Sequence, residues 1–274
     1  MPFLAERQPF GEQDAGSGSL SVSRLLCEQG KEIESLDAVI VEVPIALSFN
    51  GISYAVMMAT PSDLYDFIRG FAIGEGIVTS PRAIYDIDVT PADSGIGMPG
   101  FDVNATVSSE AAHKLKDRKR SMAGPSGCGL CGIESIQTIS RDIARLESAS
   151  LPSQDALDVA IGQMRTEQLL SQATAGAHAA AWCGYDGDIV ALREDVGRHN
   201  ALDKLIGWHS RHPTDGFVLV SSRASFEMVA KAASAGIGVL AAVSAPTSAA
   251  ITLAKQVNLT LIAFASRGRH ARYC

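Results

Sequence analysis

Two cysteines, Cys128 and Cys131, stand in a glycine-rich stretch of the sequence, GPSGCGLCGIES over residues 124–135. The C-x-x-C spacing holds two thiols close enough for metal binding, dithiol redox chemistry or nucleophilic sulfur transfer. Gly127 and Gly129 flank Cys128, and Gly132 follows Cys131, so large partners could reach the sulfur atoms. This thiol pair is the first candidate for the chemistry of the chain.

Zinc binding and thioredoxin-like redox chemistry fit the pair less well. Structural zinc takes four ligands, often from two C-x-x-C pairs, and the sequence has no second pair. A zinc nucleobase deaminase has H-x-E upstream of P-C-x-x-C, whereas here Gly127 precedes Cys128 and no such motif lies upstream. A thioredoxin motif follows an early strand, and this pair lies mid-chain. Nucleophilic chemistry remains: one cysteine accepts sulfur as a persulfide, and the other relays it or resolves a mixed disulfide.

The whole-chain totals predict a compact, reduced, cytoplasmic protein. The 274 residues are 46% hydrophobic and 19% charged, which is typical of a globular chain with a sizeable core. The net charge of -7 argues against non-specific nucleic-acid binding. The start has no secretory signal, and five cysteines, an odd number, favour free thiols. Ser244 and Pro246 interrupt the most apolar stretch, so no membrane role is predicted.

The first half of the chain predicts a small region built from hairpins and a helix. Residues 1–37 contain a Gly- and Ser-rich stretch and are interpreted as a flexible arm, with regular structure beginning near Ala38. Asn50-Gly51 between two β-like runs is a strong hairpin signal. The sequence also predicts a helix over 61–73, strands near 84–89 and 101–107, a basic helix before the cysteines, and a long helix over 153–172.

The second half alternates β-like and helical runs, including a helix from Arg198 to about His209. Such alternation predicts an α/β fold with parallel strands and crossover helices. Ligands of such sheets gather beyond the carboxyl ends of the strands. Three such ends, SSRAS (221–225), SAPTS (244–248) and ASRGR (265–269), all carry hydroxyls, and the first and third also carry arginines suited to phosphate. The alternative is that Ser225 and Thr247 only cap helices and that the arginines are solvated.

Two histidine-containing stretches are weaker candidates. REDVGRHNALDKL (193–205) is dense in functional side chains, but the favoured interpretation is a capped, charged helix start in which His199 pairs with Asp203. His178 opens an apolar strand and is interpreted as a core or edge residue. Cys27, Cys183 and Cys274 stand alone and are taken as packing residues.

Several long motifs, in order from about Val39 to the end, resemble the FdhD family of formate dehydrogenase accessory sulfurtransferases. The stretches that carry this resemblance are EVPIALSFNG, ATPSDLYDFIRGFAIGEGI, GCGLCG, HAAAW, REDVGRHNALDKL, SSRASFEMV, AVSAPTS and LTLIAFASRGR. They are far more specific than a C-x-x-C alone.

The resemblance implies a cytidine deaminase-like mixed sheet flanked by helices, without the deaminase metal, and a smaller N-terminal subdomain. The expected regions are an arm over 1–37, a hairpin and helix region over 38–120, and a core over 121–274 with the C-x-x-C loop. The fold itself does not fix the chemistry. A homodimer is also expected from the resemblance.

The resemblance also implies a reaction. Cys128 would accept persulfide sulfur from a cysteine desulfurase, with Cys131 as the second thiol, and the acceptor would be the Mo-bis(molybdopterin guanine dinucleotide) cofactor of formate dehydrogenase, for which GDP is a mimic. Arg223 and His199 are expected to contact this acceptor. The matching cofactor-binding segment is Phe264, Ala265, Ser266, Arg267, Gly268 and Arg269. The alternatives are a cofactor-binding chaperone that transfers no sulfur, and a zinc hydrolase.

Overall fold

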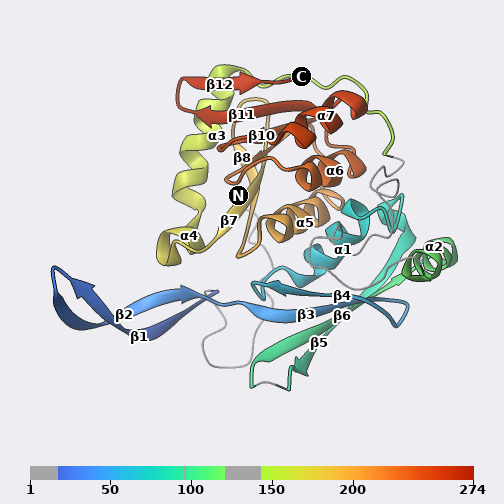
Figure 1. Cartoon of the computed structure of the whole chain (residues 1–274). Helices are drawn as coiled ribbons and strands as arrows, with labels where there is room; N and C mark the ends of the chain where they lie inside the picture. Colours follow the sequence, from blue (N-terminus) through green and yellow to red (C-terminus); the bar gives the residue numbers. More distant parts are fainter. Residues whose placement is uncertain (1–17, 96, 121–142) are drawn as a thin grey trace.

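A computed structural model describes residues 18–95, 97–120 and 143–274, in three sheets and the helices around them (Figure 1). A six-stranded mixed sheet forms the centre, a four-stranded sheet lies beyond the helices on one of its faces, and a two-stranded ribbon projects from the body. The mixed α/β class predicted from the sequence is confirmed.

The central sheet has the strand order β12-β11-β10-β9-β7-β8. Its three middle strands, β9, β10 and β11, run parallel, and α6 (Phe226–Ser234) and α7 (Ser248–Val257) connect them. β7 runs antiparallel to β9, so the start of β7 lies beside the carboxyl end of β9. The strands are β7 (His178–Cys183), β8 (Ile189–Asp195), β9 (Phe217–Val220), β10 (Val239–Ala242), β11 (Thr260–Ser266) and β12 (Arg269–Arg272).

Both faces of the central sheet are covered, which explains why its inner strands are apolar throughout. On one face, α3 (Gln154–Glu167) contributes Leu157, Ile161 and Met164 to a core with alternate residues of the strands. On the other face, α5 (Arg198–His209), α6, α7 and α1 (Leu64–Gly74) share one large core with the four-stranded sheet. The helix predicted from Arg198 to about His209 is confirmed.

The four-stranded sheet has the order β4-β3-β6-β5. Asn50 and Gly51 both have positive φ, 50° and 74°, in the turn between β3 (Val43–Phe49) and β4 (Ile52–Ala59), so the predicted hairpin is confirmed. The remaining elements of this region are the short η1 (Pro81–Ala83), β5 (Ile84–Asp93), β6 (Pro99–Val107) and α2 (Ser109–Arg120).

Two sequence-based predictions differ from the structure. Residues taken as a flexible arm form a hairpin of β1 (Ser19–Glu28) and β2 (Lys31–Ile40), whose cross-strand pairing supplies the order that local composition did not indicate. The single helix predicted over 153–172 is instead α3 and a short α4 (Leu169–Thr174), which meet at the non-helical Gln168.

No helix within the described ranges is both long and apolar enough to cross a lipid bilayer.

Candidate functional site

The two motif cysteines, Cys128 and Cys131, lie outside the described residues. Of the three other thiols, Cys27 is exposed near the tip of the ribbon and Cys183 is buried in the central sheet. Burial strongly raises the pKa of the Cys183 thiol, with smaller effects from nearby carboxylates. Cys183 is therefore a packing residue, as the sequence predicts.

The three predicted strand-end loops lie side by side at the carboxyl edge of the parallel strands. Ala224 and Pro246 form a parallel bridge, and the Thr247 amide donates to the Ala224 carbonyl at 3.0 Å. The amide of Phe264 donates to the carbonyl of Ser244 at 3.1 Å. Backbone hydrogen bonds thus join the first loop to the second, and the second to the part of β11 that leads directly into the third, so the three lie on one edge.

Phe264 has an unusual conformation at this edge. Its φ is 53°, a left-handed conformation that costs a non-glycine residue about 1–2 kcal/mol, and its side chain is 42% exposed. The pairing of β11 with β12 shifts register between Ala263 and Ser266, so Phe264 sits in a β-bulge. Strained residues of this kind cluster at functional sites because the surrounding structure holds them.

The turn that follows Phe264 presents backbone and cationic groups. Arg267 and Gly268, between β11 and β12, and Arg269, the first residue of β12, are all exposed. The Ser266 hydroxyl donates to the Arg269 carbonyl at 3.5 Å. Within the described ranges, the guanidinium groups of Arg267 and Arg269 make no hydrogen bond or ion pair. They are therefore available to an anion at this edge.

The first predicted loop carries a third exposed cation, Arg223. Ser221 accepts a hydrogen bond from the Ala179 amide at 2.9 Å, which fixes the loop to the start of β7. Thr247 caps α7 through the Ala250 amide, as the alternative interpretation predicted. Ser225 makes no side-chain cap; its hydroxyl instead contacts Glu227 at 3.4 Å.

His199 pairs with Glu227 rather than with Asp203. Its Nε2 lies 2.9 Å from Glu227 Oε2, which joins the start of α5 to the start of α6, and the two side chains are 18% and 22% exposed. The contact with His199 is the main reason why the pKa of Glu227 is lowered. His199 thus lies near the strand-end surface with one ring nitrogen engaged.

His178 is half-buried at the start of β7, opposite Asp195 of β8. Burial, followed by the charge of Arg198, lowers the pKa of His178, so its imidazole is neutral at neutral pH. The structure thus places His178 beside the start of α5 and at the same edge of the sheet as the loops.

Asp195 is a structural residue and does not contact the surface. Lys204 Nζ lies 2.7 Å from its carboxylate, and both side chains are fully buried. Asp195 also accepts hydrogen bonds from the amides of Thr60 and Gly197 and from Asn200. Because these partners surround the carboxylate, Asp195 is not available to orient a ligand.

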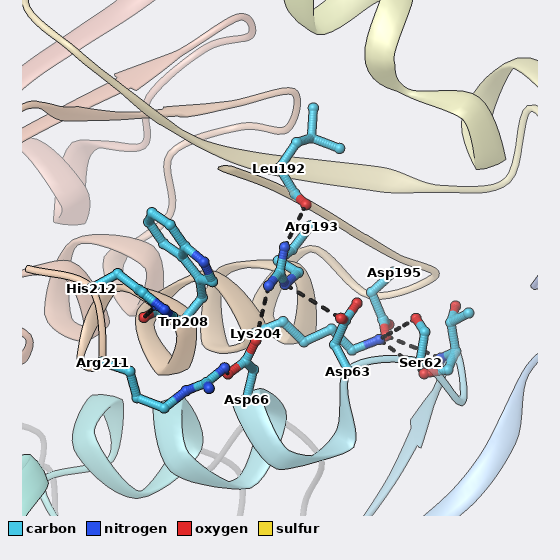
Figure 2. A network of polar contacts seen from close by, with 11 residues as sticks. Ser62, Asp63, Asp66, Leu192, Arg193, Asp195, Lys204, Trp208, Arg211 and His212 are labelled. Atoms are coloured by element: carbon cyan, nitrogen blue, oxygen red, sulfur yellow. Dashed lines mark hydrogen bonds and ion pairs between the residues drawn. The ribbon is translucent and has the colours of Figure 1, made fainter. Parts of the chain in front are cut away.

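A second ionic cluster fixes α1 to the core. Asp66 of α1 lies between two arginines, 3.0 Å from Arg193 and 2.6 Å from Arg211 (Figure 2). Sequence analysis did not single out Asp66, because these partners lie far away along the chain. Its one signal was a charged residue on an otherwise apolar helix face.

Asp203 is paired with Lys231 of α6, at 2.8 Å, and Glu75 lies 3.0 Å from the same ammonium group. Burial raises the pKa of Asp203 to about 6, despite the opposing effect of Lys231. The predicted pairing of Asp203 with His199 is therefore wrong. Both residues instead join α5 to α6, through different partners.

Within the part of the chain that the structure describes, no group of three or more His, Cys, Asp or Glu side chains is arranged to hold a metal ion. The described edge instead combines an exposed aromatic ring, three exposed arginines and serine hydroxyls. This set suits a ligand with an aromatic base and phosphate groups.

The sequence of this chain matches known proteins over most of its length. The model of the FdhD/NarQ family matches residues 40–274. The chain is 49% identical over 248 residues to the sulfur carrier protein FdhD of Cupriavidus necator, covering 89% of this chain and 84% of that protein. It is 47% identical over 241 residues to the protein of the same name from Acinetobacter baylyi, covering 86% of each.

One crystal structure, that of a candidate formate dehydrogenase accessory protein from Desulfotalea psychrophila, has a similar fold. The TM-score is 0.74, with 23% sequence identity, and the match covers 93% of this chain and 96% of that one. At this identity the similarity shows the fold alone.

Proposed function

The chain belongs to the FdhD/NarQ family, and from this premise we propose that it is a sulfur carrier that supports formate dehydrogenase. Relatives at 46–49% identity carry the name sulfur carrier protein FdhD. This likeness over most of the chain, together with the C-x-x-C motif, is the observation on which the proposal rests.

Sulfur is carried on Cys128 as a persulfide. The Cys128 thiolate attacks the outer sulfur of a persulfide on a cysteine desulfurase. A new S–S bond forms on Cys128, the donor's S–S bond breaks, and the donor cysteine leaves as a thiolate, so the exchange needs no external oxidant. Cys131 is the second thiol, which relays the sulfur or resolves a mixed disulfide. Glycines beside both cysteines leave them open to two large partners in turn.

The acceptor substrate is the Mo-bis(molybdopterin guanine dinucleotide) cofactor, bound at the strand-end surface. Phe264 offers an exposed ring on which a guanine base can stack. Arg223 and Arg269 are exposed cations at the same edge and suit the phosphates. The strained backbone of Phe264 and the hydrogen bonds that join the loops support this assignment.

A second copy of the chain docks on the β1–β2 ribbon. One face of the ribbon carries exposed or half-exposed apolar residues, and an isolated two-stranded ribbon is marginal in water. On that face Arg24 lies 2.7 Å from Asp37. A two-fold contact would bring each Arg24 near Asp37 of the partner subunit, so the face is complementary to itself. The apolar residues of this face are Leu20, Val22, Leu26, Ile33 and Val39.

Sulfur loading tests the proposal directly. The protein is incubated with a cysteine desulfurase and cysteine, and peptide mass spectrometry then locates the added sulfur. We expect one extra sulfur atom on Cys128, and none after Cys128→Ala substitution. Exposed Cys27 serves as an internal control for indiscriminate modification, and buried Cys183 as a second one. Equal loading of Cys27 and Cys128, or full support of formate dehydrogenase by Cys128→Ala, would contradict a sulfur carrier.

A further inference from the structure

We propose that Asp158 is a positioning residue for the nucleotide segment, holding the turn over 266–269 in the form that presents Arg267 and Arg269. This inference rests on the proposed nucleotide surface. Asp158 belongs to α3, on the opposite face of the central sheet from α6 and α7, and does not contact the exposed arginines or Phe264 directly.

Asp158 contacts the turn through the backbone of one residue. The amide of Gly268 donates to both carboxylate oxygens of Asp158, at 2.9 and 3.0 Å. The amide is about equally distant from the two oxygens, so the carboxylate faces it squarely. Among the described residues, the Gly268 amide has no other hydrogen-bond acceptor. A single side chain from another element therefore fixes the tip of the turn.

The geometry of the turn explains why it needs this support. Gly268 has a φ of 72°, whereas Arg267 is not among the residues of positive φ. Positive φ at only the second central residue is the pattern of a type II turn. Two-residue hairpins prefer type I′ or II′ turns, because types I and II splay the strands. Since this turn lacks the favoured twist, the bond to Asp158 holds it against the sheet.

A chain of hydrogen bonds orients Asp158 itself. His270 Nδ1 lies 2.6 Å from Gln154 Oε1, and the Gln154 amide donates to Asp158 Oδ1 at 2.7 Å. Gln154 and Asp158 are one helical turn apart on α3, and His270 is on β12, just beyond the turn. Hydrogen bonds thus connect Gly268 in the turn and His270 in β12 to two neighbouring residues on one face of α3.

The helix does not depend on Asp158 for its own packing. α3 is held by five buried residues, namely Ala156, Leu157, Ala160, Ile161 and Met164. Asp158 is only partly buried. Removal of its carboxylate should therefore release the turn while the helix stays in place.

The test measures binding of guanosine diphosphate to the full-length protein by titration calorimetry. We expect Asp158→Ala to weaken binding about tenfold, which corresponds to about 1.4 kcal/mol of binding free energy. The same substitution should accelerate amide hydrogen exchange at Gly268. Asp158→Asn keeps one acceptor oxygen and should recover most of the affinity. Asp155→Ala is the matched control, because Asp155 is an exposed carboxylate on the same helix. It should bind as the wild type does.

The outcomes separate this inference from the proposed function. Wild-type affinity in Asp158→Ala overturns the positioning role while the nucleotide surface stands. An equal loss in Asp155→Ala also overturns it, because the cause would then be general damage to α3. If the wild type binds no guanosine diphosphate while Cys128 still accepts sulfur, the nucleotide surface itself is wrong, and the positioning role falls with it.

Discussion

Lys204 and Asp195 form an ion pair that is closed to solvent on both sides, with 2.7 Å between Nζ and Oδ2 and no exposed area on either side chain. Asp195 ends β8, Lys204 lies within α5, and the Lys204 ammonium also donates to the Thr60 carbonyl at 2.9 Å. The pair therefore joins three segments: an edge strand of the central sheet, the helix that begins near the candidate site, and the chain just before α1.

Substitution of one member of this pair should be strongly destabilising. Lys204→Met leaves the Asp195 carboxylate buried without its counter-ion, which costs about 3–5 kcal/mol in such pairs. Chemical denaturation of the purified variant measures this loss. Asp195→Asn alone should also destabilise the protein. In the double variant Lys204→Met/Asp195→Asn no buried charge is left unpaired, so its loss of unfolding free energy should be smaller than the sum of the losses of the two single variants. Additive losses would show that the two side chains are not coupled.

Close packing of α1 and α5 depends on two glycines. A Cβ atom at Gly207 would overlap the carbonyl oxygen of Asp66, and one at Gly70 would overlap the carbonyl of Asp203. Since both obstacles are backbone, Gly207→Ala should lower the free energy of unfolding by about 3 kcal/mol. Gly162→Ala in α3 is the control, because nothing lies within 4 Å of the added methyl group. It should stabilise the protein by about 0.5–1 kcal/mol. Equal effects at both positions would contradict the packing described.

The contact of Glu227 with His199 predicts a pH-dependent contribution to stability. The pKa of Glu227 is lowered in the folded protein, chiefly by this contact. The contribution is therefore fully present above the unfolded-state pKa, near 4.5, and is lost as the pH falls through the folded-state value. Glu227→Gln should lose about 1 kcal/mol at pH 7 relative to the wild type, and the difference should vanish in acid.

Urea unfolding between pH 7 and pH 3 gives this comparison. Glu42→Gln changes an exposed carboxylate and should follow the wild-type curve at every pH. A Glu227→Gln deficit that stays constant down to pH 3 would mean that the side chain contributes through packing rather than charge.

The ribbon face predicts the effect of substitutions on self-association. Ile33 lies on the proposed dimer face, 46% exposed, whereas Leu36, 71% exposed, lies on the opposite face of the same strand. Ile33→Asp would bury a charge in the two-fold contact, so the dimer should dissociate, whereas Leu36→Asp should leave it intact. Sedimentation equilibrium measures both. A monomeric wild type, or equal behaviour of the two variants, would rule out this interface.

Local sequence signals were sufficient for the elements whose ends are marked by characteristic turn residues or by a regular alternation of strand and helix patterns. Asn50-Gly51 favours the left-handed conformations that a tight hairpin needs, and the alternation in the second half gave the parallel strands and the edge where three loops meet. The ribbon was missed because its order comes from pairing between β1 and β2, and its serine- and glutamate-rich strands resemble a loop in composition.

Long-range polar pairs could not be assigned in the same way. Asp195, His199 and Asp203 lie within a stretch of nine residues, and the four-residue spacing of His199 and Asp203 on a helix suggested that these two pair locally. Their partners are Lys204, Lys231 and Glu227, and only the fold brings the last two to α5. The left-handed φ of Phe264 was likewise outside the reach of sequence reasoning, because a bulky aromatic residue gives no signal for it.

The strain at Phe264 can be separated from the function of its ring by two substitutions. Both Phe264→Ala and Phe264→Gly remove the ring on which a base would stack, so both should weaken binding of guanosine diphosphate about tenfold or more. Only glycine adopts a φ of 53° without a steric penalty. The glycine variant should therefore be more stable than the alanine variant by about 1 kcal/mol. Thermal unfolding and calorimetric titration of the same three proteins test both statements. Equal stability of the two variants would show that the backbone relaxes when the ring is lost. Undiminished affinity of both variants for guanosine diphosphate would show that the Phe264 ring does not contact the nucleotide.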